Sequence, residues 1–164
     1  MNLEMILRIV VTGAAATLCM DGWALLLRRF CGITSLDYAL PGRWILWMFK
    51  GKVIHRTIIS TSPLTGEKLT GWIFHYVTGM AFAFIPLLLS GPQWINAPDF
   101  GTAAATGLLT LAAPFFIMQP ALGFGLAASR TANPQKARLM SLLTHFVFGC
   151  GLYLSAVGLR SFTL

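Results

Sequence analysis

The chain has 164 residues, of which 56% are hydrophobic and only 10% are charged, and its formal net charge is +7. A soluble domain is usually about 25% charged, so this composition excludes a water-soluble globule and indicates an integral membrane protein. The positive charge is explained by the loops of such a protein, as described below, and calls for no nucleic acid as a partner.

Four stretches are long and apolar enough to cross a bilayer, which takes about 20 residues per helix. They lie at about residues 5–27, 71–89, 101–128 and 141–159. We expect helices rather than barrel strands, because the runs are continuously apolar and do not alternate with period two. The first run continues past its small residues to Leu27, which favours an uncleaved span over a signal peptide. The sequence therefore predicts an all-α fold: a single membrane domain with four transmembrane helices in a bundle.

The loop between the first two spans, residues 30–70, contains a short apolar stretch, PGRWILWMFKGK. It is about half as long as a span and carries Trp44 and Trp47 between basic residues. This pattern predicts a short helix in the membrane interface, with both indoles anchored among the lipid headgroups and the bases facing anionic lipid. A lid over the mouth of a site is the alternative that this stretch leaves open.

Ten of the twelve Lys and Arg residues lie in the loops that follow the first and third spans. Only Arg8 and Arg160 lie on the other side. The positive-inside rule then places both basic loops in the cytoplasm and both termini on the outer side of the membrane.

Each predicted span also carries one strongly polar side chain at a similar depth. Counted from the basic residue nearest its cytoplasmic end, Asp21, His75 and His145 lie seven residues inside the span and Gln119 lies eleven. A rise of 1.5 Å per residue puts this polar layer about 10–15 Å below the cytoplasmic surface. Ionisable residues inside a membrane are candidates for a functional site, although polar side chains can also act only as glue between helices.

Several kinds of chemistry suit this layer, which Tyr76 and Met118 flank. A divalent metal could be bound by His75, His145 and Asp21, and two histidines on different helices could hold a haem iron. Without a metal, histidine and aspartate could relay protons or bind a small cation. No spacing in the chain matches a known catalytic motif.

Four stretches resemble an uncharacterised family of small bacterial inner-membrane proteins that is classed only as a domain of unknown function. They are MDGWALLLRRF, GEKLTGWIFHYVTGMAFA, PFFIMQPALGFGLAASRT and SLLTHFVFGCGLYLSA. The resemblance covers nearly the whole chain except much of the first loop. It implies a four-helix bacterial membrane protein and supplies neither an activity nor an assigned site.

The leading hypothesis is a membrane-embedded binding or transport-like protein whose intramembrane site, near the cytoplasmic side, handles a metal ion, a proton or a small cation. A membrane enzyme is the first alternative, with His75 or His145 as general base and Asp21 orienting it. A structural subunit is the second alternative. Four helices leave little room for a transport path, so a transporter of this length would need to form a homodimer, for which the small-residue faces at residues 103–107 and 151–155 are candidates.

Overall fold

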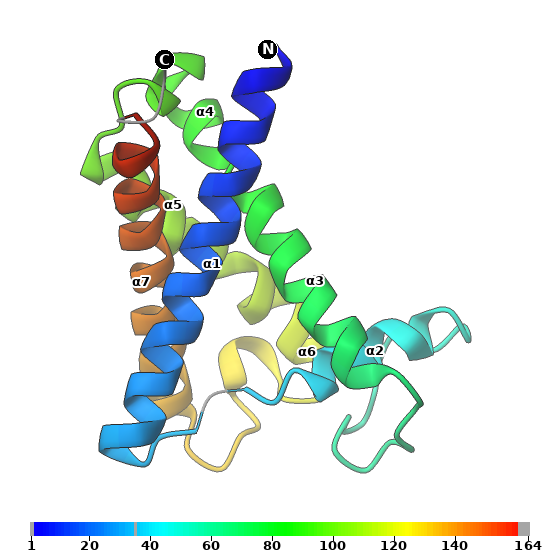
Figure 1. Ribbon diagram of the computed structural model, residues 1–164. Coiled ribbons are helices and arrows are strands. Elements are labelled where there is room, and N and C mark those ends of the chain that lie inside the picture. Colours follow the sequence, from blue (N-terminus) through cyan, green and yellow to red (C-terminus); the bar gives the residue numbers. More distant parts are fainter. Residues whose placement is uncertain (1, 35, 161–164) are drawn as a thin grey trace. The chain divides into compact units, whose positions relative to one another are not determined.

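The computed structural model describes residues 2–34 and 36–160, and over these residues it is helical and contains no strand (Figure 1). The elements are α1 (Leu3–Cys31), α2 (Ala39–Met48), α3 (Glu67–Phe82), α4 (Ile85–Ser90), the 3-10 turn η1 (Pro92–Ile95), α5 (Phe100–Thr110), the π-helical turn η2 (Pro114–Met118), α6 (Gln119–Ala121), the 3-10 turn η3 (Leu126–Ala128) and α7 (Pro134–Arg160).

Four helical stretches are long and apolar enough to cross a membrane: Leu3–Cys31, Glu67–Ser90, Phe100–Ala121 and Pro134–Arg160. The predicted all-α fold with four such helices is therefore confirmed, and so is a short helix, α2, in the first loop. The chain is a multi-pass membrane protein by this architecture.

The third span ends at Ala121 instead of continuing to residue 128 as expected. Beyond Ala121 the backbone turns through Gly123 and Gly125, which have φ angles of 87° and 75° that favour glycine. Ala127 also takes a positive φ, so the chain reverses within η3. The sequence pattern missed this reversal because the residues that make it are as apolar as those of the span.

The chain separates into two compact units, each built from segments that are distant in the sequence. The first unit comprises residues 2–34, 76–110 and 142–160, and the second comprises residues 36–75 and 111–141. Because the units interleave along the chain, the prediction of a single membrane domain stays a prediction.

Small residues bring the helices of the first unit together. The helices α1 and α7 lie beside each other (Figure 1). Gly151 of α7 lies against Ala16 of α1, and a Cβ atom at Gly151 would stand 2.9 Å from the Ala16 Cα atom. Gly107 of α5 meets Gly149 of α7 just as closely. Such close backbone approach is how helices associate in lipid, where apolar burial supplies no driving force. The unit's core contains large buried side chains as well, among them Phe148.

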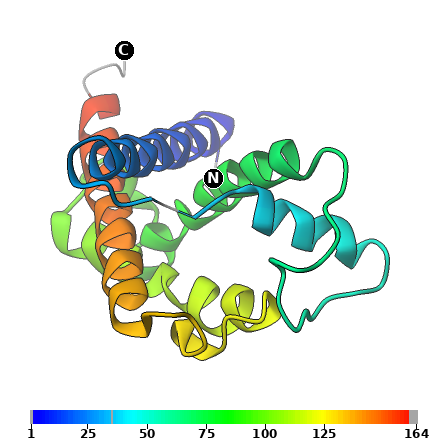
Figure 2. The same cartoon turned by 90° about the horizontal axis from the view of Figure 1, so that it is seen from below.

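In the second unit, α2 lies along the beginning of α3 (Figure 2). Gly42 meets the Glu67 carbonyl oxygen and Gly71 meets the Tyr38 carbonyl oxygen, so neither position has room for a Cβ atom. The core of this unit is small and consists of Trp44, Ile58, Ala121 and Leu122.

Trp44, one of the two indoles expected to anchor the loop among lipid headgroups, lies in this core. It is only 6% exposed, and its Nε1 donates a hydrogen bond of 2.8 Å to the Val53 carbonyl oxygen. Trp47 is partly exposed. The roles of both indoles as anchors stay predictions.

Candidate functional site

Asp21 of α1 is paired with Tyr76 of α3 inside the first unit. The Tyr76 hydroxyl donates a hydrogen bond of 2.8 Å to Asp21 Oδ2. Both side chains are partly buried, and both belong to helices long enough to cross a membrane. A charge at the centre of a bilayer costs about 2.5–3.5 kcal/mol, so a phenolic donor is one way in which α1 tolerates a carboxylate.

His145 of α7 is paired with Thr110 at the end of α5, also in the first unit. The Thr110 hydroxyl donates to the Gly107 carbonyl oxygen at 2.6 Å and lies 2.7 Å from His145 Nδ1. Which of Thr110 and His145 donates depends on the tautomer of the imidazole.

His75 of α3 belongs to an aromatic cluster in the second unit. Tyr38 precedes α2, and its hydroxyl lies 3.0 Å from His75 Nε2. The Tyr38 ring lies 4.4 Å, centroid to centroid, from both His75 and Trp72. Since Trp72 and His75 are three residues apart on one helix, they share a face. Aromatic faces of this kind attract cations.

Gln119, in the second unit, follows the π-helical turn Pro114–Met118. Pro114 and Pro120 lack backbone N–H groups, so the regular hydrogen-bond ladder is interrupted around Gln119. The Gln119 side chain is only 9% exposed, and its Oε1 atom has no hydrogen-bond partner among the described residues. A buried acceptor without a donor costs about 1–3 kcal/mol, and π turns occur often at functional sites.

The predicted layer is thus divided between the two units. Asp21 and His145, with the flanking Tyr76, belong to the first, whereas His75, Gln119 and the flanking Met118 belong to the second. A meeting of all four side chains therefore stays a prediction. Over residues 2–34 and 36–160, no three His, Cys, Asp or Glu side chains gather where they could hold a metal ion, so the metal and haem alternatives gain no support from this arrangement.

The hydroxyl partners of the two histidines, Tyr38 and Thr110, were not predicted from the sequence. A single threonine in a span gives no signal of its own, because such residues usually bond to the carbonyl one turn earlier, as Thr17 and Thr106 do here. Tyr38 lies 37 residues before its partner His75 and outside the predicted spans, so nothing local in the sequence connects the two.

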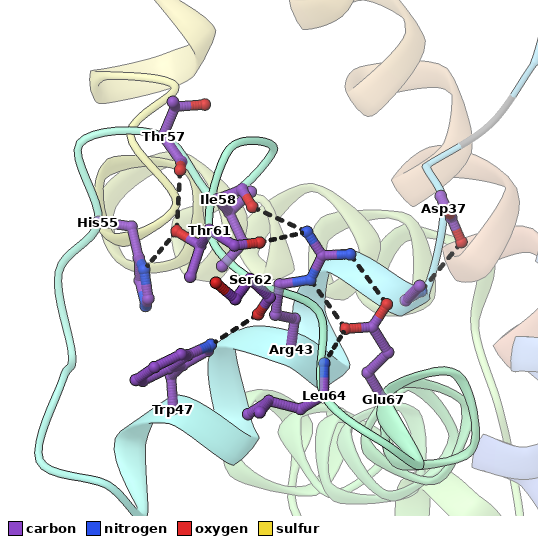
Figure 3. A network of polar contacts seen from close by, with 11 residues as sticks. Asp37, Arg43, Trp47, His55, Thr57, Ile58, Thr61, Ser62, Leu64 and Glu67 are labelled. Carbon is purple, nitrogen blue, oxygen red and sulfur yellow. Dashed lines mark hydrogen bonds and ion pairs between the residues drawn. The ribbon is translucent and has the colours of Figure 1, made fainter.

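An ion pair between Arg43 of α2 and Glu67 of α3 organises the first loop (Figure 3). This ion pair was not predicted from the sequence either. Arg43 Nε and Nη2 donate to the two Glu67 carboxylate oxygens at 2.8 and 2.9 Å. The Glu67 side chain is the main cause that raises the pKa of Arg43, against a smaller opposing effect of burial. Arg43 Nη1 donates to the carbonyl oxygens of Ile58 and Thr61 at 3.1 and 2.9 Å, so one guanidinium joins α2, α3 and the loop.

Comparison with known proteins gives one family match. The model of a family described as "Protein of unknown function (DUF2938)" matches residues 10–158. No curated protein and no solved structure matches the chain.

Proposed function

This chain belongs to the DUF2938 family of unknown function, and we propose a function for it. The proposal is that the chain is a transporter-like protein of the bacterial inner membrane and binds a small cation or a proton within the membrane. The coarser part of this statement, a multi-pass membrane protein, rests on the four long apolar helices. The ten-to-two distribution of Lys and Arg supports an orientation with both basic loops in the cytoplasm.

The observation that carries the proposal is the buried Oε1 atom of Gln119, which has no hydrogen-bond partner in the part of the chain that the structure describes. Native proteins leave few buried polar atoms unpaired, and each one needs a reason. Gln119 lies two residues before the end of the third span at Ala121, so burial within the protein, and not depth in the membrane, shields this atom from water. An amide oxygen is an acceptor and a ligand for hard cations, so a bound cation or a donor group on a small ligand would satisfy it.

The other three polar residues supply groups that a cation or proton requires. Asp21 contributes a carboxylate, and its hydrogen bond from Tyr76 depends on how that carboxylate is protonated. His75 and His145 contribute imidazoles, whose ring nitrogens can donate or accept a proton. The aromatic cluster around His75 adds faces that favour positive charge.

The test compares wild type with Gln119→Leu in a neutral detergent. Leucine is close in size and has no polar atom, so the unliganded variant should be more stable than wild type by about 1–2 kcal/mol. Thermal unfolding is then measured in sodium, potassium, manganese and zinc chloride, with N-methyl-glucamine chloride as the reference salt, and across pH 5–8. One of these conditions should stabilise wild type and should not stabilise Gln119→Leu.

Gln135→Leu is the matched control, because Gln135 is an exposed glutamine at the beginning of α7. It should respond to every salt and pH value as wild type does. If wild type and Gln119→Leu respond alike to all of these conditions, Gln119 takes no part in binding and the proposal is wrong. Metal analysis of protein purified without a metal column separates a metal ligand from the other cations.

A further inference from the structure

The second unit contains a polar cavity that the intramembrane residues do not use. Its volume is about 260 Å³, slightly below the roughly 300 Å³ at which small-molecule sites begin. The lining consists of two basic side chains, one indole and four hydroxyl-bearing side chains, without any acidic residue. Trp47 lies in the last turn of α2, the other six residues lie between α2 and α3, and all seven are outside the four candidate spans.

The lining has the chemistry of an anion site. Lys52 and Arg56 supply positive charge, and Thr57 and Ser62 supply hydroxyl donors. The Ser60 hydroxyl donates to the Thr57 carbonyl oxygen at 3.4 Å and offers a ligand its oxygen atom. The Lys52 ammonium lies 5.6 Å from the centroid of the Trp47 ring, which also lines the cavity. Ammonium, guanidinium and hydroxyl groups together are the usual ligands of a phosphate group.

Hydrogen bonds hold the backbone of the loop that forms the cavity. Arg43 holds the loop through the carbonyl oxygens of Ile58 and Thr61 (Figure 3). The Thr61 hydroxyl donates to the Thr57 carbonyl oxygen at 3.0 Å and lies 3.0 Å from Nδ1 of the buried His55. A site whose walls are already held in place loses less entropy when a ligand binds.

The same loop exposes large apolar side chains. Phe49 is 86% exposed, Ile54 is 74% exposed and Ile59 is 66% exposed. In a loop bathed only by water, three such residues so close in sequence would be unfavourable. Apolar side chains alternating with bases are typical of a segment that lies in the membrane interface, with its apolar groups in the acyl region and its charges at the headgroups.

We propose that this cavity binds the headgroup phosphate of an anionic phospholipid, with Lys52 and Arg56 as the charged ligands. The exposed apolar residues of the loop favour a lipid over free phosphate, because only a lipid brings acyl chains to the same place. This site is separate from the intramembrane residues and does not rest on the proposed function.

The test measures binding of dihexanoyl-phosphatidylglycerol to the full chain in a neutral detergent by native mass spectrometry. Dihexanoyl-phosphatidylcholine and inorganic phosphate are the comparison probes. A basic residue near an anionic lipid strengthens binding about fivefold, so Lys52→Gln with Arg56→Gln should weaken phosphatidylglycerol binding about 25-fold. The matched control is Lys68→Gln with Lys136→Gln, which removes the same charge from exposed positions outside the cavity and should change binding less than twofold.

The remaining outcomes overturn the proposal in distinct ways. If the two double variants lose affinity for phosphatidylglycerol equally, only the overall positive charge attracts the lipid. If the protein binds phosphatidylcholine as tightly, the site does not recognise an anionic headgroup. If it binds inorganic phosphate as tightly, the cavity is a site for free phosphate and not for a lipid. Because Lys52 and Arg56 are exposed, the variants at these positions should fold.

The double variant Ser60→Ala with Ser62→Ala tests the same cavity without a change in charge. It should weaken the binding of phosphatidylglycerol severalfold.

Discussion

Replacing Arg43 by methionine should release the first loop from the two helices that hold it. The substitution removes two hydrogen bonds to the Glu67 carboxylate and two to the carbonyl oxygens of Ile58 and Thr61. Glu67 keeps one donor, the Leu64 backbone N–H at 3.0 Å. The methionine preserves the aliphatic stem, so the change isolates the charge and its hydrogen bonds.

The expected cost is about 3 kcal/mol. Removing one partner of a buried ion pair costs about 3–5 kcal/mol, and the lower end applies because the Arg43 and Glu67 side chains are 12% and 15% exposed. A local opening that becomes 3 kcal/mol easier exchanges its amide hydrogens roughly 150-fold faster.

Hydrogen–deuterium exchange with mass spectrometry in detergent measures this effect peptide by peptide. Exchange over residues 57–64 should rise by about two orders of magnitude, and exchange in α7 should not change. Arg56→Met is the control, because Arg56 lies in the same loop and is exposed. If exchange over residues 57–64 is unchanged, or rises equally in Arg56→Met, the ion pair does not hold the loop.

Three further predictions follow from the same structure. Gly71→Ala should lower the free energy of unfolding, measured in mixed micelles, by about 2–3 kcal/mol, because the added Cβ atom would overlap a backbone carbonyl of the preceding segment. Gly22 has open space around it, so Gly22→Ala should change the free energy of unfolding by less than about 0.5 kcal/mol. Burial, and secondarily a nearby lysine, lower the pKa of His55 below 6.5. The unfolded chain therefore binds the proton more tightly than the folded chain, and the stability of the fold should decrease as the pH drops through about 6.5. Thermal unfolding measured at several pH values should show this decrease in wild type and not in His55→Gln. Tyr76→Phe should lower the free energy of unfolding by about 1 kcal/mol, since it removes one hydrogen bond. The free energy of unfolding of Asp21→Asn should lie within about 1 kcal/mol of the wild-type value, because an amide oxygen still accepts that bond. If wild type shows a proton-dependent response that persists in Asp21→Asn, Asp21 is excluded as the group responsible.

The amino-acid sequence by itself determined the class of protein and most of its helices. Continuous apolar runs of about 20 residues have few stable alternatives to a helix across a bilayer, because every backbone polar group must be satisfied within the segment. The apolar stretch after Pro41 likewise predicted α2. These features depend on neighbouring residues only, which is why one sequence was enough to find them.

Only the tertiary structure decided what each polar side chain contacts. Asp21 finds its donor 55 residues later in Tyr76, and His145 finds its hydroxyl 35 residues earlier in Thr110. Such pairs depend on which helix faces pack together, and close backbone contacts such as Gly151 against Ala16 set that packing. Trp44 shows the same limit, since nothing in its short apolar stretch predicts that it packs with Ile58 and Leu122 in the core of the second unit. Hydropathy measures how apolar a residue is, whereas the side chain's neighbours are chosen by shape and hydrogen bonding across the whole fold.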